Sequence, residues 1–344
     1  MKIKPPLITL IILLLLVTGC TTPGKKLDLY YEKSCNHEIT SGDSIHVTYL
    51  GAGGYLMRRG ADSLLLAPFF SNPGLLRVGL SKIKSKIKII DEYLPAVEDV
   101  ETILIGHSHY DHLMDVPYIA KYHATKATIY GNKTMTHLLA PYFDNRSRLV
   151  NLNPIAGERM QGQWVYIPNG NIRFMAIKSE HGPQFGGIRL LKRKELNEDL
   201  YQCPRKSSHW VQGQTFTFII DFLGVDGTVE FRIHYQDAAS NPPKGFPPVG
   251  IENIDLAILC AAAFHEVKKY PEGILDKIKP KHIIVGHWEN FFRSYAKPPR
   301  TVPFTNIKKF IEQVLKMKSE DSDCYVPEPG ACITYRINRN STKQ

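Results

Sequence analysis

The chain has 344 residues, 43% of them hydrophobic, and a formal net charge of +10. This apolar content is enough to offset the conformational entropy of folding, which excludes a mainly disordered protein. A multi-span membrane protein is also excluded, because only one stretch of the sequence is apolar enough to enter a bilayer. The positive charge is spread along the chain, and no compact basic and aromatic module indicates binding to nucleic acid.

The N-terminus carries the pattern of an export signal. Lys2 and Lys4 precede an apolar run at 7–17, which is too short to cross a bilayer but has the length of a signal-peptide core. The small residues Thr18 and Gly19 follow, directly before Cys20. This order resembles the lipobox of bacterial lipoproteins, although a plain signal peptide or a short N-terminal anchor is the alternative.

The lipobox resemblance implies three segments. Residues 1–19 would be removed as a signal peptide, Cys20 would carry lipid, and 20–40 would be a tether to a single domain at 41–344. Several acyl chains together make a stable anchor, so the partner would be a membrane. We therefore expect a lipid-anchored protein of the bacterial cell envelope, facing the periplasm or the cell surface.

An exported protein can oxidise some of its cysteines. Cys324 and Cys332 flank a turn-rich stretch, so a local disulfide between them is one expectation. Cys260 lies in an apolar run and is expected to be a buried thiol. No CxxC pair is present, so a cysteine-based zinc site has no support.

The first part of the domain is rich in β-prone runs, with helices further along. We expect an antiparallel meander of three strands, and then strands and helices in alternation. The expected ranges are strands at 45–50, 55–58, 63–67, 102–105 and 127–130, with helices at 115–123 and 132–141. Residues 71–98, where lysines alternate with isoleucines and serine, are open between a strand and a loop insertion.

The second part repeats this organisation. We expect strands at 164–168, 172–177, 215–222, 229–235, 255–259 and 282–285, with helices at 272–278 and 307–317. The last helix is amphipathic, with lysines on its outer face. Two sheet-rich halves, each closed by helices, indicate an α/β fold with four layers in the order αββα. The polar loops at the strand ends would meet along one edge.

Three histidines and an aspartate lie within six residues directly after the expected strand at 102–105. They form the pattern HxHxDH, with His107, His109, Asp111 and His112. Such a pattern arises by chance roughly once in a thousand sequences of this composition. Neutral imidazole and carboxylate are the ligands that zinc takes when no thiolate is supplied. The motif therefore predicts a metal site, with the strand as its rigid base.

A metal ion needs further ligands from elsewhere in the chain. His181, Asp237 and His287 each follow an expected strand, where loops carry chemistry on such scaffolds. Asp221 and Asp226 are weaker alternatives to Asp237 in the same hairpin.

Together these motifs resemble those of the metallo-β-lactamase-fold hydrolase superfamily. The HxHxDH motif, a single His, an Asp and a final His recur in the family's order, after a Gly-rich opening hairpin at 50–56. The details around 109–113 and 286–291 are most similar to the branch of N-acylphosphatidylethanolamine phospholipase D and the ascorbate-lactone hydrolases. One position departs from the family. The turn Ala67-Pro68-Phe69 stands where an Asp is common, which leaves open what orients the ligands.

The resemblance implies a four-layer αββα metallo-β-lactamase-like sandwich with two divalent metal ions. His107, His109 and His181 would hold the first ion, and Asp111, His112 and His287 the second. Asp237 would be the carboxylate that bridges both. Zinc is the default metal, and manganese or iron is an alternative for ligands of this type. Asp111 and Asp237 would also be catalytic, by offsetting the cationic charge and orienting the attacking water.

Other histidines have weaker cases. His209 either contacts substrate, donates a proton or is an exposed loop residue. His265 follows a buried strand and is a second candidate for substrate contact. We expect His234 to be packed in the core or to contact a ligand residue.

These features predict a membrane-anchored, metal-dependent hydrolase that activates water. Its substrate would be a small molecule or a lipid, with a phosphodiester, in a phospholipid for example, as the first choice. Hydrolysis of a lactone, ester or amide is the runner-up. The alternative of another class is a surface-anchored binding protein that keeps its metals for stability.

Overall fold

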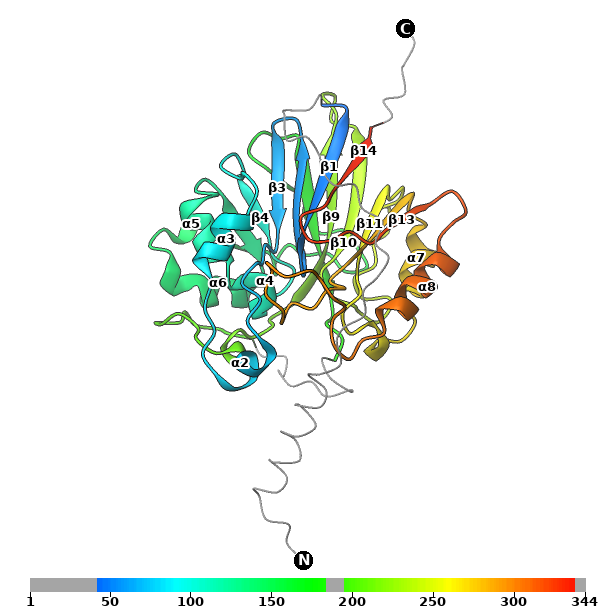
Figure 1. The fold of residues 1–344 in the computed structure, drawn as a ribbon. Helices are drawn as coiled ribbons and strands as arrows, with labels where there is room; N and C mark the ends of the chain where they lie inside the picture. Colours follow the sequence, from blue (N-terminus) through cyan, green and yellow to red (C-terminus); the bar gives the residue numbers. More distant parts are fainter. Residues whose placement is uncertain (1–41, 184–194, 338–344) are drawn as a thin grey trace, which may run out of the picture.

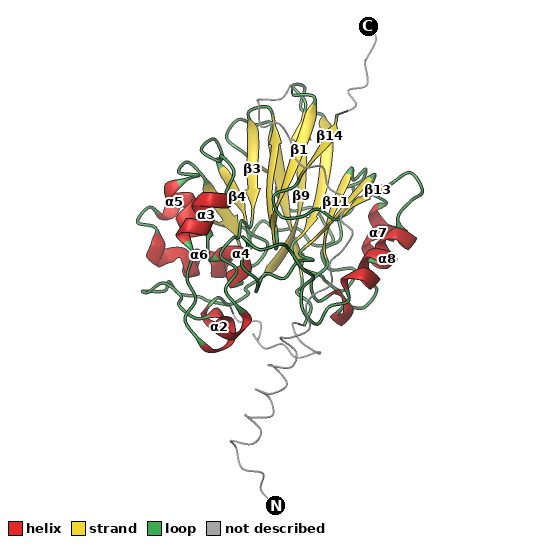
Figure 2. Ribbon diagram, viewed as in Figure 1, coloured by secondary structure: helices red, strands yellow, loops and turns green. Residues whose placement is uncertain are grey.

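The fold is built on two seven-stranded mixed sheets packed face to face. The computed structural model describes residues 42–183 and 195–337, so the expected signal peptide, Cys20 and the tether lie outside the described residues. The first sheet has the strand order β14-β1-β2-β3-β4-β5-β6, and the second has the order β13-β12-β11-β10-β9-β8-β7. Helices cover the outer face of each sheet, which gives the expected αββα sandwich (Figure 2).

The first sheet confirms the expected meander and strand–helix alternation. Its strands are β1 Ser44–Gly51, β2 Gly54–Arg59, β3 Asp62–Leu66, β4 Thr102–Leu104, β5 Thr128–Gly131, β6 Leu149–Asn151 and β14 Cys332–Arg336. Strands β14 to β3 pair antiparallel, whereas β3 to β6 pair parallel. The helices that follow these strands are α2 Leu75–Leu80, α3 Ile87–Tyr93, α4 Tyr110–Leu113, α5 Val116–Tyr122 and α6 Lys133–Leu139.

The second sheet has the same mixture of pairings. Its strands are β7 Val165–Tyr166, β8 Ile172–Ser179, β9 Thr215–Leu223, β10 Val229–Gln236, β11 Leu256–Cys260, β12 His282–Gly286 and β13 Asp323–Tyr325. Helices α7 Glu272–Ile278 and α8 Ile307–Met317 cover it at the ranges expected from the sequence. Among the described residues, no helix is both long and apolar enough to cross a membrane.

Side-chain alternation along the strands divides the core into layers. On β3, Leu64 and Leu66 belong to the cluster between the sheets, whereas Leu65 belongs to the cluster beneath the helices of the first sheet. Ile103 also lies in the helix-facing cluster, and Leu104 lies in the cluster between the sheets. Because successive side chains of a strand point to opposite faces, both faces of this sheet are apolar and covered.

The segment 71–98, left open by the sequence, forms two short helices, α2 and α3 (Figure 1). The alternation of lysine and isoleucine does not reflect a strand. Ile83 and Ile90, seven residues apart, are buried, whereas Ile87 between them is exposed. Lys82, Lys84 and Lys88 are exposed, whereas Lys86 is partly buried and its Nζ donates to the Asn72 carbonyl at 3.1 Å.

The expected disulfide between Cys324 and Cys332 is wrong. Cys324 is a free thiol, whereas Cys332 is disulfide-bonded. The two residues lie on different sheets, because β13 is the edge of the second sheet and β14 the edge of the first. The turn-rich stretch between them carries the chain from one sheet to the other. Cys260 is a buried free thiol, as expected.

Candidate metal centre

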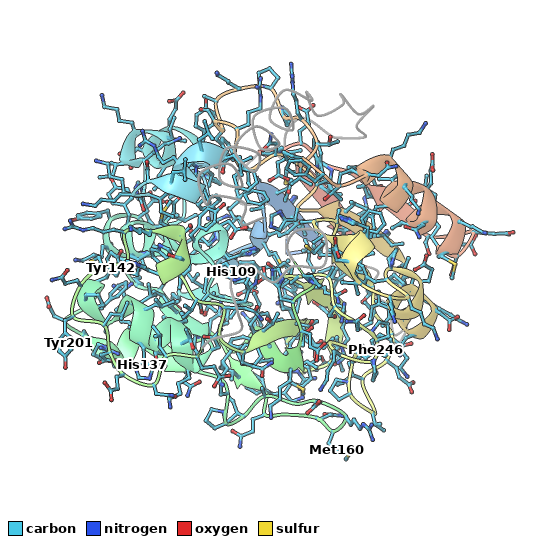
Figure 3. The ribbon with its side chains drawn as sticks, turned by 90° about the horizontal axis from the view of Figure 1, so that it is seen from below. His109, His137, Tyr142, Met160, Tyr201 and Phe246 are labelled. Atoms are coloured by element: carbon cyan, nitrogen blue, oxygen red, sulfur yellow. The ribbon has the colours of Figure 1, made fainter. Side chains whose placement is uncertain are left out.

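The HxHxDH motif lies at the lower ends of the central strands in Figure 1. His107 and His109 follow β4, and Asp111 and His112 lie in α4, the short helix that follows at once. The other three predicted ligands follow β8, β10 and β12 of the second sheet. Since these strand ends meet at one edge of the sandwich, residues up to 180 positions apart come together. Figure 3 looks onto this end of the molecule, with His109 near the middle of the face.

The first cluster consists of His107, His109 and His181. Each offers one nitrogen, and these atoms lie within 4.8 Å of one another. The ring centroids of His107 lie 4.7 Å from those of both other histidines. His107 and His109 are buried, and His181 is partly buried. The Nδ1 atom of His181 lies 2.6 Å from the carbonyl oxygen of Gly182, so Nδ1–H donates there and Nε2 keeps its lone pair.

The second cluster consists of Asp111, His112 and His287. The Asp111 Oδ2 atom lies 3.7 Å from His112 Nε2 and 3.5 Å from His287 Nε2. Ligands around a tetrahedral zinc ion, with bonds of about 2.0–2.2 Å, are themselves about 3.4 Å apart. The spacing of these three atoms therefore fits a cation of that size.

Asp237 lies between the two clusters and is 1% exposed. Its Oδ2 atom accepts a hydrogen bond of 2.6 Å from His107 Nδ1, and its Oδ1 atom lies 2.9 Å from His112 Nδ1. One carboxylate thus contacts one histidine of each cluster. With the proton of His107 on Nδ1, its Nε2 carries a lone pair, and this buried atom has no hydrogen-bond partner. An unpartnered buried nitrogen aimed into a histidine cluster fits a metal ligand.

The charge states of His109, His181 and Asp237 favour cation binding at neutral pH, whereas Asp237 and Asp111 outweigh burial and raise the pKa of His112, so a cation there must displace a proton. Burial, with the nearby His107, lowers the pKa of the His181 imidazole to about 3. Burial and the neighbouring histidines also hold the pKa of His109 well below 6.5. Burial opposes ionisation of Asp237, but His112 and His107 more than offset it and hold its pKa well below 3.8. Neutral imidazoles beside ionised carboxylates are the state in which these residues bind metals.

Glycine at position 53 allows a close approach in this centre. A Cβ atom on Gly53 would lie 2.6 Å from both His112 Nδ1 and Asp237 Oδ1. No side chain fits there unless the ligand residues move. The Gly-rich hairpin between β1 and β2 is therefore part of the wall of the site.

Two residues that sequence reasoning missed hold the second cluster in place. The Tyr49 hydroxyl on β1 accepts a hydrogen bond from the His287 backbone N–H and donates one to the buried carboxylate of Glu289. The same carboxylate accepts from the backbone N–H of Ala52 at 2.5 Å. Glu289 lies two residues after His287 in the sequence, and this proximity is the one sequence signal that could have indicated its role beside the second cluster.

Asp115 and Asn132 brace the loops around the motif. The Asp115 carboxylate accepts hydrogen bonds from the backbone N–H groups of Phe70 and Ser71, both at 2.8 Å, and from the Ser71 hydroxyl at 2.6 Å. These contacts fix the backbone that follows the turn Ala67-Pro68-Phe69 after β3, which lacks the Asp that is common in the family. Asn132 caps α6 and bonds to Ser108, the residue between His107 and His109.

The weaker histidine candidates, His209 and His265, are expected to contact substrate rather than a metal ion. His209 is exposed in a short 3₁₀ helix, Ser207–His209, and His265 is exposed beside Glu266. Neither belongs to a group of potential ligands among the described residues. His234 is fully buried and bonds to the carbonyl oxygen of Gly245, which agrees with a packed core histidine. Asp221, an alternative to Asp237, instead pairs with Arg173 and Arg232.

Comparison with known proteins agrees with this geometry. Residues 89–198, about a third of the chain, match the family described as the beta-lactamase superfamily domain, and this stretch contains the HxHxDH motif and His181. A metal-dependent hydrolase from Aeropyrum pernix is 38% identical over 74 residues. That match covers 22% of this chain and 24% of the relative, so the chain spans about a quarter of the curated relative.

Solved structures cover much more of the chain. The metallo hydrolase Igni18 from Ignicoccus hospitalis superposes with a TM-score of 0.51 at 13% identity, over 85% of this chain and 99% of that one. The chain has the metallo-β-lactamase fold. An isothiocyanate hydrolase from Delia radicum gut bacteria superposes with a TM-score of 0.50 at 12% identity, over 85% of this chain and 99% of that one.

Proposed function

We propose that the chain is a hydrolase that uses two divalent cations, zinc by default, to act on a phosphodiester. The observation that carries the proposal is the pair of ligand clusters joined by one buried carboxylate. His107, His109 and His181 would hold one cation, and Asp111, His112 and His287 the other. All are predicted ligands, and the ligand chemistry also admits manganese or iron.

The chain's own residues have defined tasks in this scheme. When bound, such cations lower the pKa of water and polarise the oxygen of the group under attack. Asp237, the predicted bridging carboxylate, forms a group of potential ligands with one histidine of each cluster, and its contacts orient the His107 and His112 rings. Asp111 and Asp237 offset the positive charge of two cations in a buried site. Tyr49 and Glu289 hold the backbone of His287 and so keep the second cluster in position.

The substrate is the less constrained part of the proposal. A phosphodiester in a phospholipid fits the similarity of the motifs to the phospholipase branch, the expected lipid anchor at Cys20 and the net positive charge. A lactone, an ester or an amide is the second choice within hydrolases. The placement in the bacterial cell envelope, bound to a membrane through Cys20, belongs to the same proposal.

Hydrolysis and metal content should be measured on the same preparation. The purified full chain would be tested with a chromogenic phosphodiester, a lactone and a β-lactam, and its bound metals counted by elemental analysis. We expect two cations for each chain and cleavage of the phosphodiester. His109→Ala should lose one cation and about 10³-fold or more in rate, since it removes a ligand from the first cluster.

The matched control is His123→Ala, which removes a partly exposed histidine that pairs with Asp91 and belongs to neither cluster. It should keep both metals and the full rate. Cleavage of the lactone alone would redirect the proposal to the second choice. A chain that keeps two cations but cleaves none of the three substrates would support the non-catalytic metal-binding alternative.

A further inference from the structure

Helix α2 exposes most of its apolar surface, although Val78 packs against the core beneath the helices of the first sheet. None of the residues of Leu75–Leu80 is buried. Leu76 and Leu80, four positions apart and so on one face of the helix, are 55% and 72% exposed. A helix in a globular protein normally buries its apolar side chains against the core, and these two point into solvent. Ile87, at the start of α3, is 51% exposed and extends the apolar surface.

The same segment is strongly basic. Residues 75–88, here called the α2 platform, contain Arg77 and four lysines and no acidic residue. Lys82, Lys84 and Lys88 are exposed. Apolar side chains rimmed by cations are the composition of a surface that lies on an anionic bilayer.

Hydrogen bonds fix the platform to the body of the protein. Its Val78 carbonyl accepts a bond of 2.7 Å from the Ser207 hydroxyl, and the Ile83 backbone N–H donates to the carbonyl of Arg205. The Ser85 hydroxyl donates to the carbonyl of Met114 at 2.9 Å, two residues after His112. The segment that carries the exposed leucines is thus anchored to the folded domain by hydrogen bonds and is not a free loop.

The platform lies at the same end of the molecule as the metal centre. In Figure 1, α2 projects below the strand ends and below α4, the helix that carries Asp111 and His112. A surface that rested on α2 would face the end of the sandwich where the two ligand clusters lie.

We propose that the α2 platform docks on an anionic lipid bilayer and orients the metal centre toward it. Leu76, Leu80 and Ile87 enter the apolar boundary, and the lysines contact the lipid phosphates. Each lysine near such a surface raises binding roughly fivefold. This inference concerns how the folded domain lies on the membrane, so it does not depend on the proposed hydrolysis.

The test places a tryptophan on the platform of the full chain. Leu80→Trp is reconstituted into phosphatidylcholine vesicles with and without phosphatidylglycerol, in which the acyl chains carry bromine as a quencher. The matched control is Val225→Trp, at the fully exposed tip of the β9–β10 hairpin, away from the metal centre. Every variant keeps the apolar run at 7–17, so differences in quenching report orientation rather than attachment.

We expect the anionic vesicles to quench about half of the added emission of Leu80→Trp and little of that of Val225→Trp. Reversing two charges with Lys82→Glu and Lys84→Glu should abolish the difference. The same reversal at Lys308 and Lys309, which are exposed on α8, should not. Equal quenching of both tryptophans, or equal quenching without phosphatidylglycerol, would overturn the proposal. A blue shift of Leu80→Trp that rises with protein concentration in the absence of vesicles would also overturn it, in favour of a second copy as the occupant.

Discussion

The Tyr49 hydroxyl accepts a hydrogen bond of 2.8 Å from the backbone N–H of His287. This bond joins the first sheet to the loop after β12 of the second. His287 has a φ of 51°, in the left-handed region that non-glycine residues rarely occupy. Tyr49 therefore supports a strained backbone at a candidate metal ligand, as occurs where function requires a particular side-chain direction.

Tyr49→Phe should weaken both the fold and the second cluster. The change leaves the His287 N–H without its acceptor and removes one of the two donors to the buried Glu289 carboxylate, which costs about 1–3 kcal/mol. We expect a lower melting temperature and less than one cation at the second cluster, measured by calorimetry and elemental analysis. The control Tyr166→Phe removes a hydroxyl on an exposed side chain, which accepts a 3.3 Å bond from Arg173 away from His287, and should change neither. Melting and metal content like those of the parent protein would show that Tyr49 does not position His287.

Gly53→Ala should displace the ligands without changing their chemistry. The added Cβ would lie 2.6 Å from His112 Nδ1, so the imidazole must move. Overpacking of this kind costs about 1–3 kcal/mol, and the second cluster should bind its cation more weakly. Titration with Co²⁺, followed by its visible absorption, would measure the change. Gly79→Ala, where a Cβ meets nothing within 4 Å, should bind Co²⁺ as the parent does.

The metal ligands could be predicted because their signal is local or tied to strand ends. Four of the seven lie within six consecutive residues, and His181, Asp237 and His287 each follow a strand whose apolar run is clear in the sequence. The residues that support them carry no such pattern. Tyr49 sits among ordinary strand residues, and nothing in its own neighbourhood indicates that its hydroxyl meets a loop more than 230 positions away.

The strands and helices that the sequence did not predict were missed for similar physical reasons. Strands β6 and β13 are three residues long and lie at sheet edges, so they contain too few residues to show alternation. Within the α2 platform, residues 82–88 alternate lysine with isoleucine or serine with period two, which is typical of a strand, yet residues 82–86 form an irregular connection between α2 and α3. Its conformation is set by bonds to residues 205 and 207, which the local sequence cannot indicate.

His234 should make the stability depend on pH. Burial lowers the pKa of its imidazole to about 4, against 6.5 when unfolded. Between pH 6.5 and 4 the His234 imidazole is therefore protonated in the unfolded chain but neutral in the folded one. The stability of the fold falls as the pH falls through this range. From pH 7 to pH 5 this contributes about 2 kcal/mol.

The variant His234→Gln isolates that contribution. Glutamine keeps a donor for the Gly245 carbonyl but does not titrate. Urea unfolding should show that lowering the pH from 7 to 5 reduces the free energy of unfolding less in the variant than in the parent, by about 2 kcal/mol. His123→Gln, at a partly exposed histidine, should lose as much stability as the parent. An unchanged pH dependence in His234→Gln would mean that this imidazole titrates normally in the fold.

Asn132→Ala should affect the first cluster as well as a helix end. The Asn132 Oδ1 atom accepts from the Met135 N–H of α6 at 2.8 Å and from the Ser108 hydroxyl at 3.0 Å. Its Nδ2 atom donates to the carbonyls of Gln212 and Gln214, at 3.1 and 2.7 Å. One buried side chain thus ties the helix cap to the ligand loop and to the segment before β9. We expect a loss of about 2–4 kcal/mol, more than a cap alone contributes.

The matched control is Asn306→Ala, because Asn306 also caps a helix, with its side chain accepting from the Lys309 N–H at 3.1 Å. It precedes α8 and bonds to no ligand residue or ligand loop in the described structure, so its variant should lose about 1 kcal/mol with full metal content. Asn132→Ala should in addition bind the first cation more weakly, since Ser108 between two ligand histidines loses its partner. Equal losses of stability in the two variants, with both metals retained, would mean that Asn132 acts only as a helix cap.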